Sequence, residues 1–152
     1  MKRMLVALVV PVVLAACGSA GNTSLTTPSG PATVSVRGSS LGQILVDGNG
    51  KTLYLFEADT GTQSTCSGAC AQGWPPLTTT GSPKATGGAN QALLGTTARG
   101  DGTTQVIYSG HPLYYFVGDT KPGDVNGEGS TAFGAGWDVL APSGAKIEKP
   151  GA

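Results

Sequence analysis

Two segments of the chain, sixty residues apart, carry the same order of apolar and polar residues. Residues 50–60 read GKTLYLFEADT and residues 110–120 read GHPLYYFVGDT, and six of the eleven aligned pairs are identical. Each segment follows an apolar, strand-like run, at 43–47 or at 104–108, and a turn that contains glycine. Strand, tight turn and strand is the simplest interpretation, so each copy is predicted to form a β-hairpin.

The repeated motif is Tyr-x-Phe-x-x-Asp, and each copy later reaches Gly-Trp-x-x-Leu. Side chains alternate along a strand, so Tyr and Phe share one face and the neighbouring residues share the other. Both faces are apolar, which predicts that both are covered. We expect the aromatic residues to pack in a pseudosymmetric core and each Asp to hold a turn through backbone N–H groups. The alternatives are a ligand platform made by the aromatic rings and a paired acid site at the pseudo-axis. The residues concerned are Tyr54, Phe56, Asp59 and Trp74 in the first copy and Tyr114, Phe116, Asp119 and Trp137 in the second.

The composition favours strands and turns over helices. The chain has 25 Gly and 10 Pro among 152 residues, and only 12% of its residues are charged. No window shows a capped apolar repeat with helical period, and further strand pairs are expected around turns at 100–102 and 143–144. The predicted fold class is all-β: a small sandwich or barrel built from two pseudosymmetric hairpin or meander repeats. A single domain is expected at 33–150, with repeats at about 41–80 and 101–142.

The N-terminus predicts export. Lys2 and Arg3 precede an apolar stretch that is too short to span a bilayer, so residues 1–16 are interpreted as a signal peptide. The stretch ends in LAAC at 14–17, which resembles the lipobox of bacterial lipoproteins. That resemblance implies a diacylglyceryl group on Cys17, whereas the alternative is an ordinary signal peptide with a chance cysteine. Residues 17–32 are uncharged and small, as in a flexible tether. The mature protein is expected on the cell membrane or outer membrane, outside the cytoplasm.

The charge balance narrows the range of partners. Without Lys2 and Arg3, seven basic residues remain against nine acids, a formal charge of −2. No basic patch is visible, so nucleic acid is not expected, and membrane lipid is the one partner that the sequence predicts. No cofactor is predicted apart from the lipid on Cys17. The chain has a single histidine and no Gly-x-Ser-x-Gly motif, and we predict that it is not an enzyme.

Two cysteines remain after Cys17. In an oxidising compartment, Cys66 and Cys70 are predicted to form a disulfide. The alternative is an envelope redox or copper-handling protein in which His111 joins these cysteines, similar to copper-delivery proteins of the Sco type. Ala71 stands where those proteins have Pro, and His111 aligns with Lys51 at a turn, which favours a solvent-facing side chain.

A second candidate metal site lies in DVNGEG at 124–129. Asp124, Asn126 and Glu128 have the spacing that opens an EF-hand calcium loop. The twelfth position of such a loop is Ala135, where a bidentate acid is needed. A polar turn rich in glycine explains the same residues.

The motifs together resemble one family. The LAAC sequence, the paired Tyr-x-(aromatic)-x-x-Asp motifs, CSGACAQGWPPL at 66–77 and GDTKPGDVNGEG at 118–129 are similar to those of bacterial lipoproteins of the secreted-repeat family. The resemblance implies an extracytoplasmic repeat protein, and it supplies no catalytic residues because the family has no established activity. The expected function is therefore that of a non-enzymatic binding or surface scaffold protein, with an undetermined protein or small-molecule partner.

Overall fold

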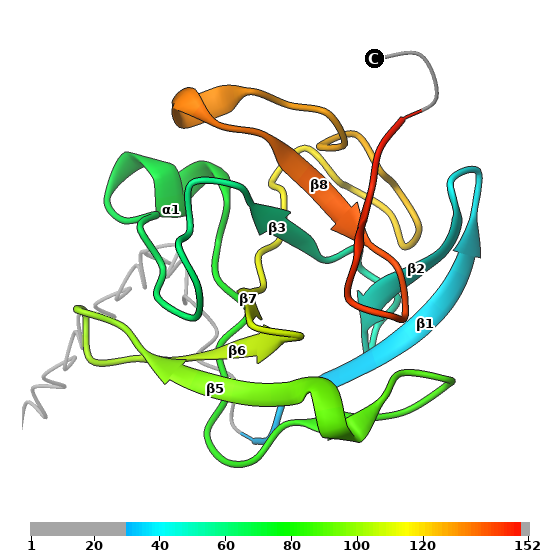
Figure 1. Ribbon diagram of the computed structural model, residues 1–152, viewed down its shortest axis with the longest axis horizontal. Coiled ribbons are helices and arrows are strands. Elements are labelled where there is room, and N and C mark those ends of the chain that lie inside the picture. Colours follow the sequence, from blue (N-terminus) through cyan, green and yellow to red (C-terminus); the bar gives the residue numbers. More distant parts are fainter. Residues whose placement is uncertain (1–29, 150–152) are drawn as a thin grey trace, which may run out of the picture.

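The computed structural model describes residues 30–149, and this part of the chain is built almost entirely of short strands (Figure 1). Three sheets of three strands have the orders β2-β1-β4, β3-β8-β9 and β5-β6-β7. The all-β prediction is confirmed. The sheets do not close into a barrel within the described residues, and the arrangement is sandwich-like. The strands are β1 (Thr33–Ser39), β2 (Gly42–Asp47), β3 (Tyr54–Phe56), β4 (Lys84–Ala85), β5 (Leu94–Ala98), β6 (Thr104–Tyr108), β7 (His111–Pro112), β8 (Trp137–Leu140) and β9 (Lys146–Ile147). The helical turns are α1 (Ala69–Gly73), η1 (Gln91–Leu93) and η2 (Ala132–Gly134).

The predicted hairpins are present, and each has one more strand than expected. Leu53 N donates to Leu45 O at 3.1 Å, and Leu113 N donates to Val106 O at 3.0 Å, so each motif follows its hairpin turn as predicted. The first arm of each hairpin also pairs on its other side, β2 with β1 and β6 with β5. The strand pairs expected around 100–102 and 143–144 are confirmed as β5–β6 and β8–β9.

The two repeats meet at a pair of tyrosines. Tyr54 N donates to Tyr114 O, and Tyr114 N donates to Tyr54 O, both at 2.9 Å. This reciprocal pair is the closely spaced pattern of antiparallel strands, and it is what a two-fold axis between the residues produces. The flanking bridges repeat the relation, since Tyr54 pairs with Val139 and Tyr114 pairs with Pro76.

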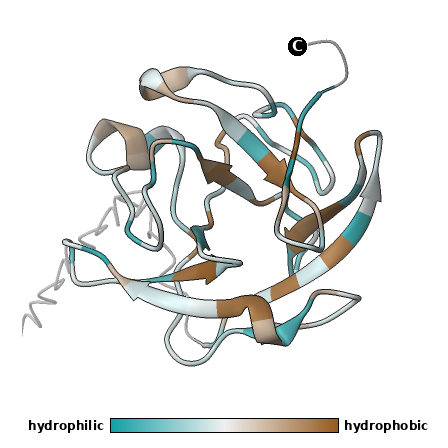
Figure 2. Cartoon of the chain, in the orientation of Figure 1, coloured by the Kyte–Doolittle hydropathy of each residue, from teal (hydrophilic) through white to brown (hydrophobic). Residues whose placement is uncertain are grey.

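The central strands have an apolar cluster on each face. Leu53, Leu55 and Leu113 belong to one cluster, whereas Tyr54 and Tyr114 belong to the other, as alternation predicts. In Figure 2, β3 is mostly brown, while β1 alternates along its length between brown and paler or teal residues. A strand with both faces covered must be apolar on both, and β1 has one covered face. Burial of a Leu or Phe side chain contributes about 1.5–3 kcal/mol to the stability of the folded state. These two clusters therefore supply most of the favourable free energy of folding.

No helix within residues 30–149 is long and apolar enough to cross a membrane. The signal peptide at 1–16, Cys17 and most of the tether at 17–32 lie outside the described residues.

Candidate functional site

The repeated motif is completed across the pseudo-axis. Tyr54 Oη donates to Asp119 Oδ2 at 2.6 Å, and Tyr114 Oη donates to Asp59 Oδ2 at 2.6 Å. Each tyrosine therefore bonds to the aspartate of the other repeat. Hydrogen bonds in which the acceptor is ionised are short and about twice as strong as neutral ones.

The second oxygen of each aspartate holds a loop. Asp59 Oδ1 accepts from Thr65 N at 2.7 Å, and Asp119 Oδ1 accepts from Asn126 N at 2.9 Å. The predicted turn-holding interaction with backbone N–H groups is thus observed in both copies, and the cross-repeat bond was not predicted. The geometry does not show a paired acid site, because each carboxylate accepts hydrogen bonds from a separate tyrosine and a separate loop.

Burial sets the protonation states of these groups. Burial raises the pKa of both tyrosines, and the hydrogen-bonded aspartate raises the pKa of each further, so both hydroxyls remain donors. Asp119 is 5% exposed, and its burial raises the pKa of its carboxyl despite the bond from Tyr54. With its oxygens occupied, neither aspartate is placed to take a proton from a substrate.

Four aromatic rings form a column through the centre of the aromatic cluster. Trp74 and Trp137 are stacked with centroids 3.9 Å apart and an interplanar angle of 8°. Phe56 stacks on Trp137 at 4.1 Å, and Phe116 stacks on Trp74 at 4.4 Å, so each Phe contacts the Trp of the other repeat. The two tyrosines meet the indoles edge-on, Tyr54 at Trp74 and Tyr114 at Trp137. Such pairs stabilise by about 0.5–1.5 kcal/mol each beyond their burial. The rings serve as a packed core, so the interpretation as an open ligand platform is wrong.

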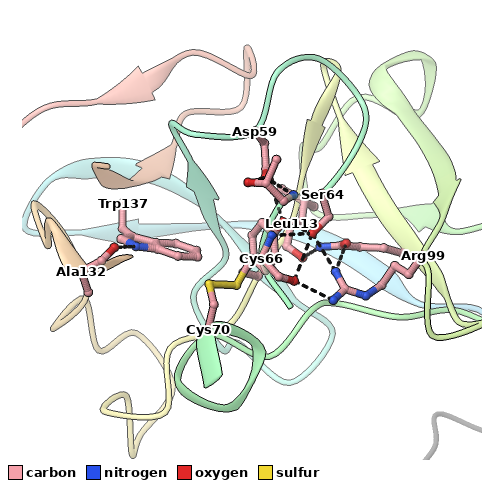
Figure 3. The surroundings of a disulfide bond; sticks show 11 residues. Asp59, Ser64, Cys66, Cys70, Arg99, Leu113, Ala132 and Trp137 are labelled. Carbon is pink, nitrogen blue, oxygen red and sulfur yellow. Dashed lines mark hydrogen bonds between the residues drawn. A yellow bond between two sulfur atoms is a disulfide. The ribbon is translucent and has the colours of Figure 1, made fainter. Parts of the chain in front are cut away.

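A disulfide joins Cys66 to Cys70, as predicted, and both half-cystines are buried beside the tryptophans. Figure 3 shows the disulfide between Trp137 on one side and Arg99 on the other. Trp137 Nε1 donates to Ala132 O at 2.8 Å, which ties the loop before β8 to the same cluster.

Arg99 is a buried cation that the sequence analysis missed. Its side chain is 5% exposed, and its guanidinium donates to Ser64 Oγ at 2.8 Å, Gln105 Oε1 at 2.7 Å and Cys66 O at 2.8 Å. Asp101 is the carboxylate that pairs with it, at 3.4 Å from Nε, and that side chain is largely exposed. Arg99 follows β5 at a hairpin turn, where a basic residue ordinarily faces solvent, so no signal in the sequence marks it.

Ser64 connects Arg99 to the repeated motif. Ser64 Oγ lies 2.6 Å from Tyr114 Oη, which in turn donates to Asp59. The second copy has a backbone group in this place, since Gly127 N donates to Tyr54 Oη at 3.3 Å. The polar chain from Asp59 through Tyr114 and Ser64 to Arg99 therefore has no counterpart at Tyr54. It borders a small pocket of about 210 Å³ that Gln63, Ser67 and Asp101 also line.

A larger groove of about 540 Å³ lies elsewhere, between the start of β1 and the segment 75–78. Tyr115 Oη donates to Asp47 Oδ2 at 2.9 Å at this groove, and Pro75 and Pro76 form part of its wall. The Lys51 ammonium lies 5.5 Å from the centroid of the Tyr115 ring.

The candidate calcium ligands make hydrogen bonds within the fold. Asp124 Oδ2 accepts from the backbone of Thr120 and Lys121, and Asn126 Nδ2 donates to Gly118 O. Glu128 Oε2 accepts from Val139 N. In this arrangement the three residues stabilise a turn: Asp124 Oδ2 and Glu128 Oε2 accept from backbone N–H groups and the Asn126 amide donates, whereas Glu128 Oε1 is buried without a partner in residues 30–149. From residue 30 to 149, no group of three or more His, Cys, Asp and Glu side chains is arranged to hold a metal ion.

The candidate copper ligands lie in different places. Cys66 borders the pocket beside Arg99, whereas His111 borders another pocket with Glu57, Asp59 and Lys146. The sulfurs of Cys66 and Cys70 are bonded to each other. His111 is half-buried in β7, next to the turn at which sequence analysis placed it.

Comparison with known proteins identifies the repeats. A family model described as a secreted repeat of unknown function matches residues 35–78 and 95–141, more than half of the 152 residues. Each matched range contains one Tyr-x-Phe-x-x-Asp motif and one Gly-Trp-x-x-Leu sequence. No curated protein matches the chain, and no solved structure does. The chain therefore belongs to the family of secreted repeats of unknown function, as the resemblance of its motifs indicated.

Proposed function

We propose that this protein is a lipid-anchored, non-enzymatic binding or scaffold protein of the cell envelope. Its place outside the cytoplasm agrees with its membership of a secreted-repeat family. The LAAC sequence at 14–17 supports attachment of a diacylglyceryl group to Cys17. Two or more acyl chains anchor a protein stably, whereas one chain holds it only marginally. Cell membrane lipid or outer membrane lipid is then its first partner.

One observation carries the non-enzymatic part of the proposal: the polar atoms of the repeated motif are used inside the fold. Both tyrosine hydroxyls donate to aspartates, and the second oxygen of each aspartate accepts from a backbone N–H group. A general base or nucleophile must instead reach a substrate. The duplicated part of the chain is a clamp between two repeats.

A ligand is then expected where the repeats differ. The groove between Thr33 and Pro76 is a concave surface of mixed polar and apolar character, with the Tyr115–Asp47 pair at its wall. Binding sites are typically concave surfaces with few, well-placed polar groups.

The anchoring is tested by mass spectrometry of the protein purified from a membrane fraction. The expected N-terminal residue is Cys17 carrying acyl chains, and a Cys17→Ser chain should keep residues 1–16 and carry no lipid. A soluble mature protein with an unmodified N-terminus would refute the anchor.

The non-enzymatic role is tested separately, with the copper alternative as its counterpart. Thiols are titrated in the denatured, unreduced mature protein, and its copper content is measured after purification. No free thiols and no copper are expected, because Cys66 and Cys70 are joined. A stable pair of free thiols with retained copper would replace the scaffold proposal by a copper-handling role for Cys66, Cys70 and His111.

A further inference from the structure

Two large apolar side chains are exposed at one end of the domain. Val117 is 59% exposed and Phe133 is 54% exposed, and they are the large apolar residues left uncovered within residues 30–149. Both lie at Gly73: Val117 N donates to Gly73 O at 3.1 Å, and Phe133 Cε2 is 3.9 Å from where a β-carbon on Gly73 would be. We call Val117 and Phe133 the apolar tip.

The fold holds Phe133 outward in an unfavourable backbone conformation. Its φ is 64°, in the left-handed region that residues other than Gly, Asn and Asp rarely adopt. The loop is fixed on both sides of this residue, by the bond from Trp137 Nε1 to Ala132 O and by Gly134 N donating to Thr131 O at 3.3 Å. An exposed aromatic ring in a strained, fixed loop indicates a surface that contacts something outside the domain.

The segments that form the apolar tip carry no charge. The segments that meet there, residues 67–77, 115–118 and 129–137, contain no Lys, Arg, Asp or Glu. An apolar surface can enter the headgroup and acyl boundary of a bilayer without desolvating a charge, which would be costly. In the pseudosymmetric position of Val117, the first repeat has Glu57, paired with Lys146 at 2.6 Å. Glu57 N donates to Gly136 O at 2.9 Å, so the Glu57–Lys146 pair borders the segment 129–137 and forms a polar edge beside the apolar tip.

The position of the tether would allow the apolar tip to face the membrane. Gly30 O accepts from Thr80 N, whereas the apolar tip lies at Gly73, seven residues earlier at the end of α1. At about 3.3 Å per residue, seven residues span at most about 23 Å. In Figure 1 the described chain begins in blue at the bottom of the view, and the orange loop before β8 lies at the top. Thirteen residues, 17–29, join Cys17 to Gly30, and a coil of that length spans about 20 Å. An anchored domain can therefore place the apolar tip on the bilayer with its tether near its preferred span.

We propose that Val117 and Phe133 dip into the bilayer that holds the acyl chains of Cys17, so that the domain lies tip-down on the membrane. This inference rests on the proposed lipid anchor. It leaves the groove at Asp47 and Tyr115 and the start of β1 directed away from the lipid surface.

The native tryptophans report on this contact. Trp137 bonds to the residue before Phe133, and Trp74 follows Gly73, so both indoles lie directly behind the apolar tip. The lipidated full-length mature protein is reconstituted in phosphatidylcholine vesicles whose acyl chains are either ordinary or brominated, because bromine quenches indole fluorescence at short range. We expect a loss of tryptophan fluorescence in the brominated vesicles.

Two variants and a control make the test specific. The Val117→Ser, Phe133→Ser double variant should sediment with vesicles as before and lose the quenching. Deletion of residues 20–27 leaves five tether residues, which span at most about 18 Å, so quenching should also be lost. The Lys84→Ser, Thr96→Ser double variant changes exposed residues elsewhere and should keep it.

The outcomes separate the two proposals. A lipidated protein that sediments with vesicles without quenching overturns the tip-down orientation and leaves the anchor intact. Unchanged quenching in the Val117→Ser, Phe133→Ser variant overturns it as well. A dimer cross-linked through residue 133, with no quenching, would assign the apolar tip to a second copy instead. A protein without lipid that stays off the vesicles refutes the anchor and this inference together.

Discussion

The hydroxyl of Tyr54 donates to the carboxylate of Asp119 across 65 positions of sequence, at 2.6 Å. Its counterpart bond, from Tyr114 to Asp59, has the same length. Neither repeat satisfies its own motif, so an isolated repeat would leave a buried hydroxyl and a carboxylate without partners. The exchange of partners therefore joins two units that depend on each other into one domain.

Replacing Gly127 by Ala should destabilise the aromatic column. A β-carbon there would lie 2.7 Å and 2.9 Å from Trp74 ring atoms and 3.1 Å from Phe116 Cβ. The stacked indole cannot move aside, so we expect a loss of about 1–3 kcal/mol in the free energy of unfolding, measured with urea. Gly38→Ala is the matched control, because no atom lies within 4 Å of its β-carbon position. Equal effects of the two substitutions would show that the column is loosely packed.

Replacing Arg99 by Lys should destabilise the disulfide loop. A single ammonium cannot reach Ser64 Oγ, Gln105 Oε1 and Cys66 O together, and each lost bond leaves a buried acceptor. We expect a loss of about 2–3 kcal/mol and faster amide hydrogen exchange over residues 64–72. The exposed Arg37→Lys should change stability by less than about 0.5 kcal/mol. Unaltered exchange in the loop would contradict the role assigned to Arg99.

Removing the disulfide with Cys66→Ala and Cys70→Ala should have a moderate effect. The closed loop is short, with a sequence separation of 4, and chain entropy then gives about 2 kcal/mol. For a domain of this size the expected fall in Tm is roughly 6–10 °C, measured by circular dichroism. An unchanged Tm would mean that the loop is held by its side-chain contacts alone.

The stability of the domain should rise as the pH falls from neutral, and then decline. Burial raises the pKa of the carboxyls of Asp119, Glu128 and Asp138. Their folded-state pKa values exceed the unfolded ones, so the cost of ionising these carboxyls is present at neutral pH and disappears as the pH falls through the folded-state values. The pKa of the Glu57 carboxyl is lowered, chiefly by its hydrogen bond from Lys146, so its contribution is lost at lower pH. Urea midpoints between pH 3 and 8 should therefore pass through a maximum on the acidic side.

Asp138→Asn tests whether buried carboxylates cause the rise in stability toward acidic pH. Asp138 is 7% exposed, and its Oδ2 has no hydrogen-bond partner within the described chain. Removing the charge should raise stability at pH 7 by about 1 kcal/mol and flatten the rise toward acidic pH. A midpoint that increases steadily up to pH 8 in the parent protein would exclude the account.

The sequence pattern was sufficient for the parts of the fold that are local. Leu53 and Tyr54 lie on opposite faces because side chains alternate along a strand, and the β5–β6 hairpin turns at a glycine-rich segment. β1 was not predicted, because the first repeat was placed at about 41–80 and β1 ends at Ser39. Its counterpart β5 is recognisable only by the turn that follows it.

The contacts between the repeats could not be predicted. Tyr54 is five residues from Asp59 and 65 from Asp119. The motif alone does not indicate which of these two aspartates accepts the hydrogen bond from Tyr54. The burial of Arg99 depends likewise on Ser64 and Cys66, which belong to the other repeat. The apolar tip depends on a positive φ at Phe133, which apolar periodicity does not specify.

The claim that the motif is a clamp between repeats is tested most directly by two double-mutant cycles in urea unfolding. The first combines Tyr54→Phe with Asp119→Asn, and the second combines Tyr54→Phe with Asp59→Asn, the aspartate of the same repeat. We predict a coupling energy of about 1.5–3 kcal/mol in the first cycle, the range for a hydrogen bond to a charged group. In the second cycle the effects should add within about 0.5 kcal/mol. A coupling confined to Tyr54 and Asp59, or none in the first cycle, would contradict the account.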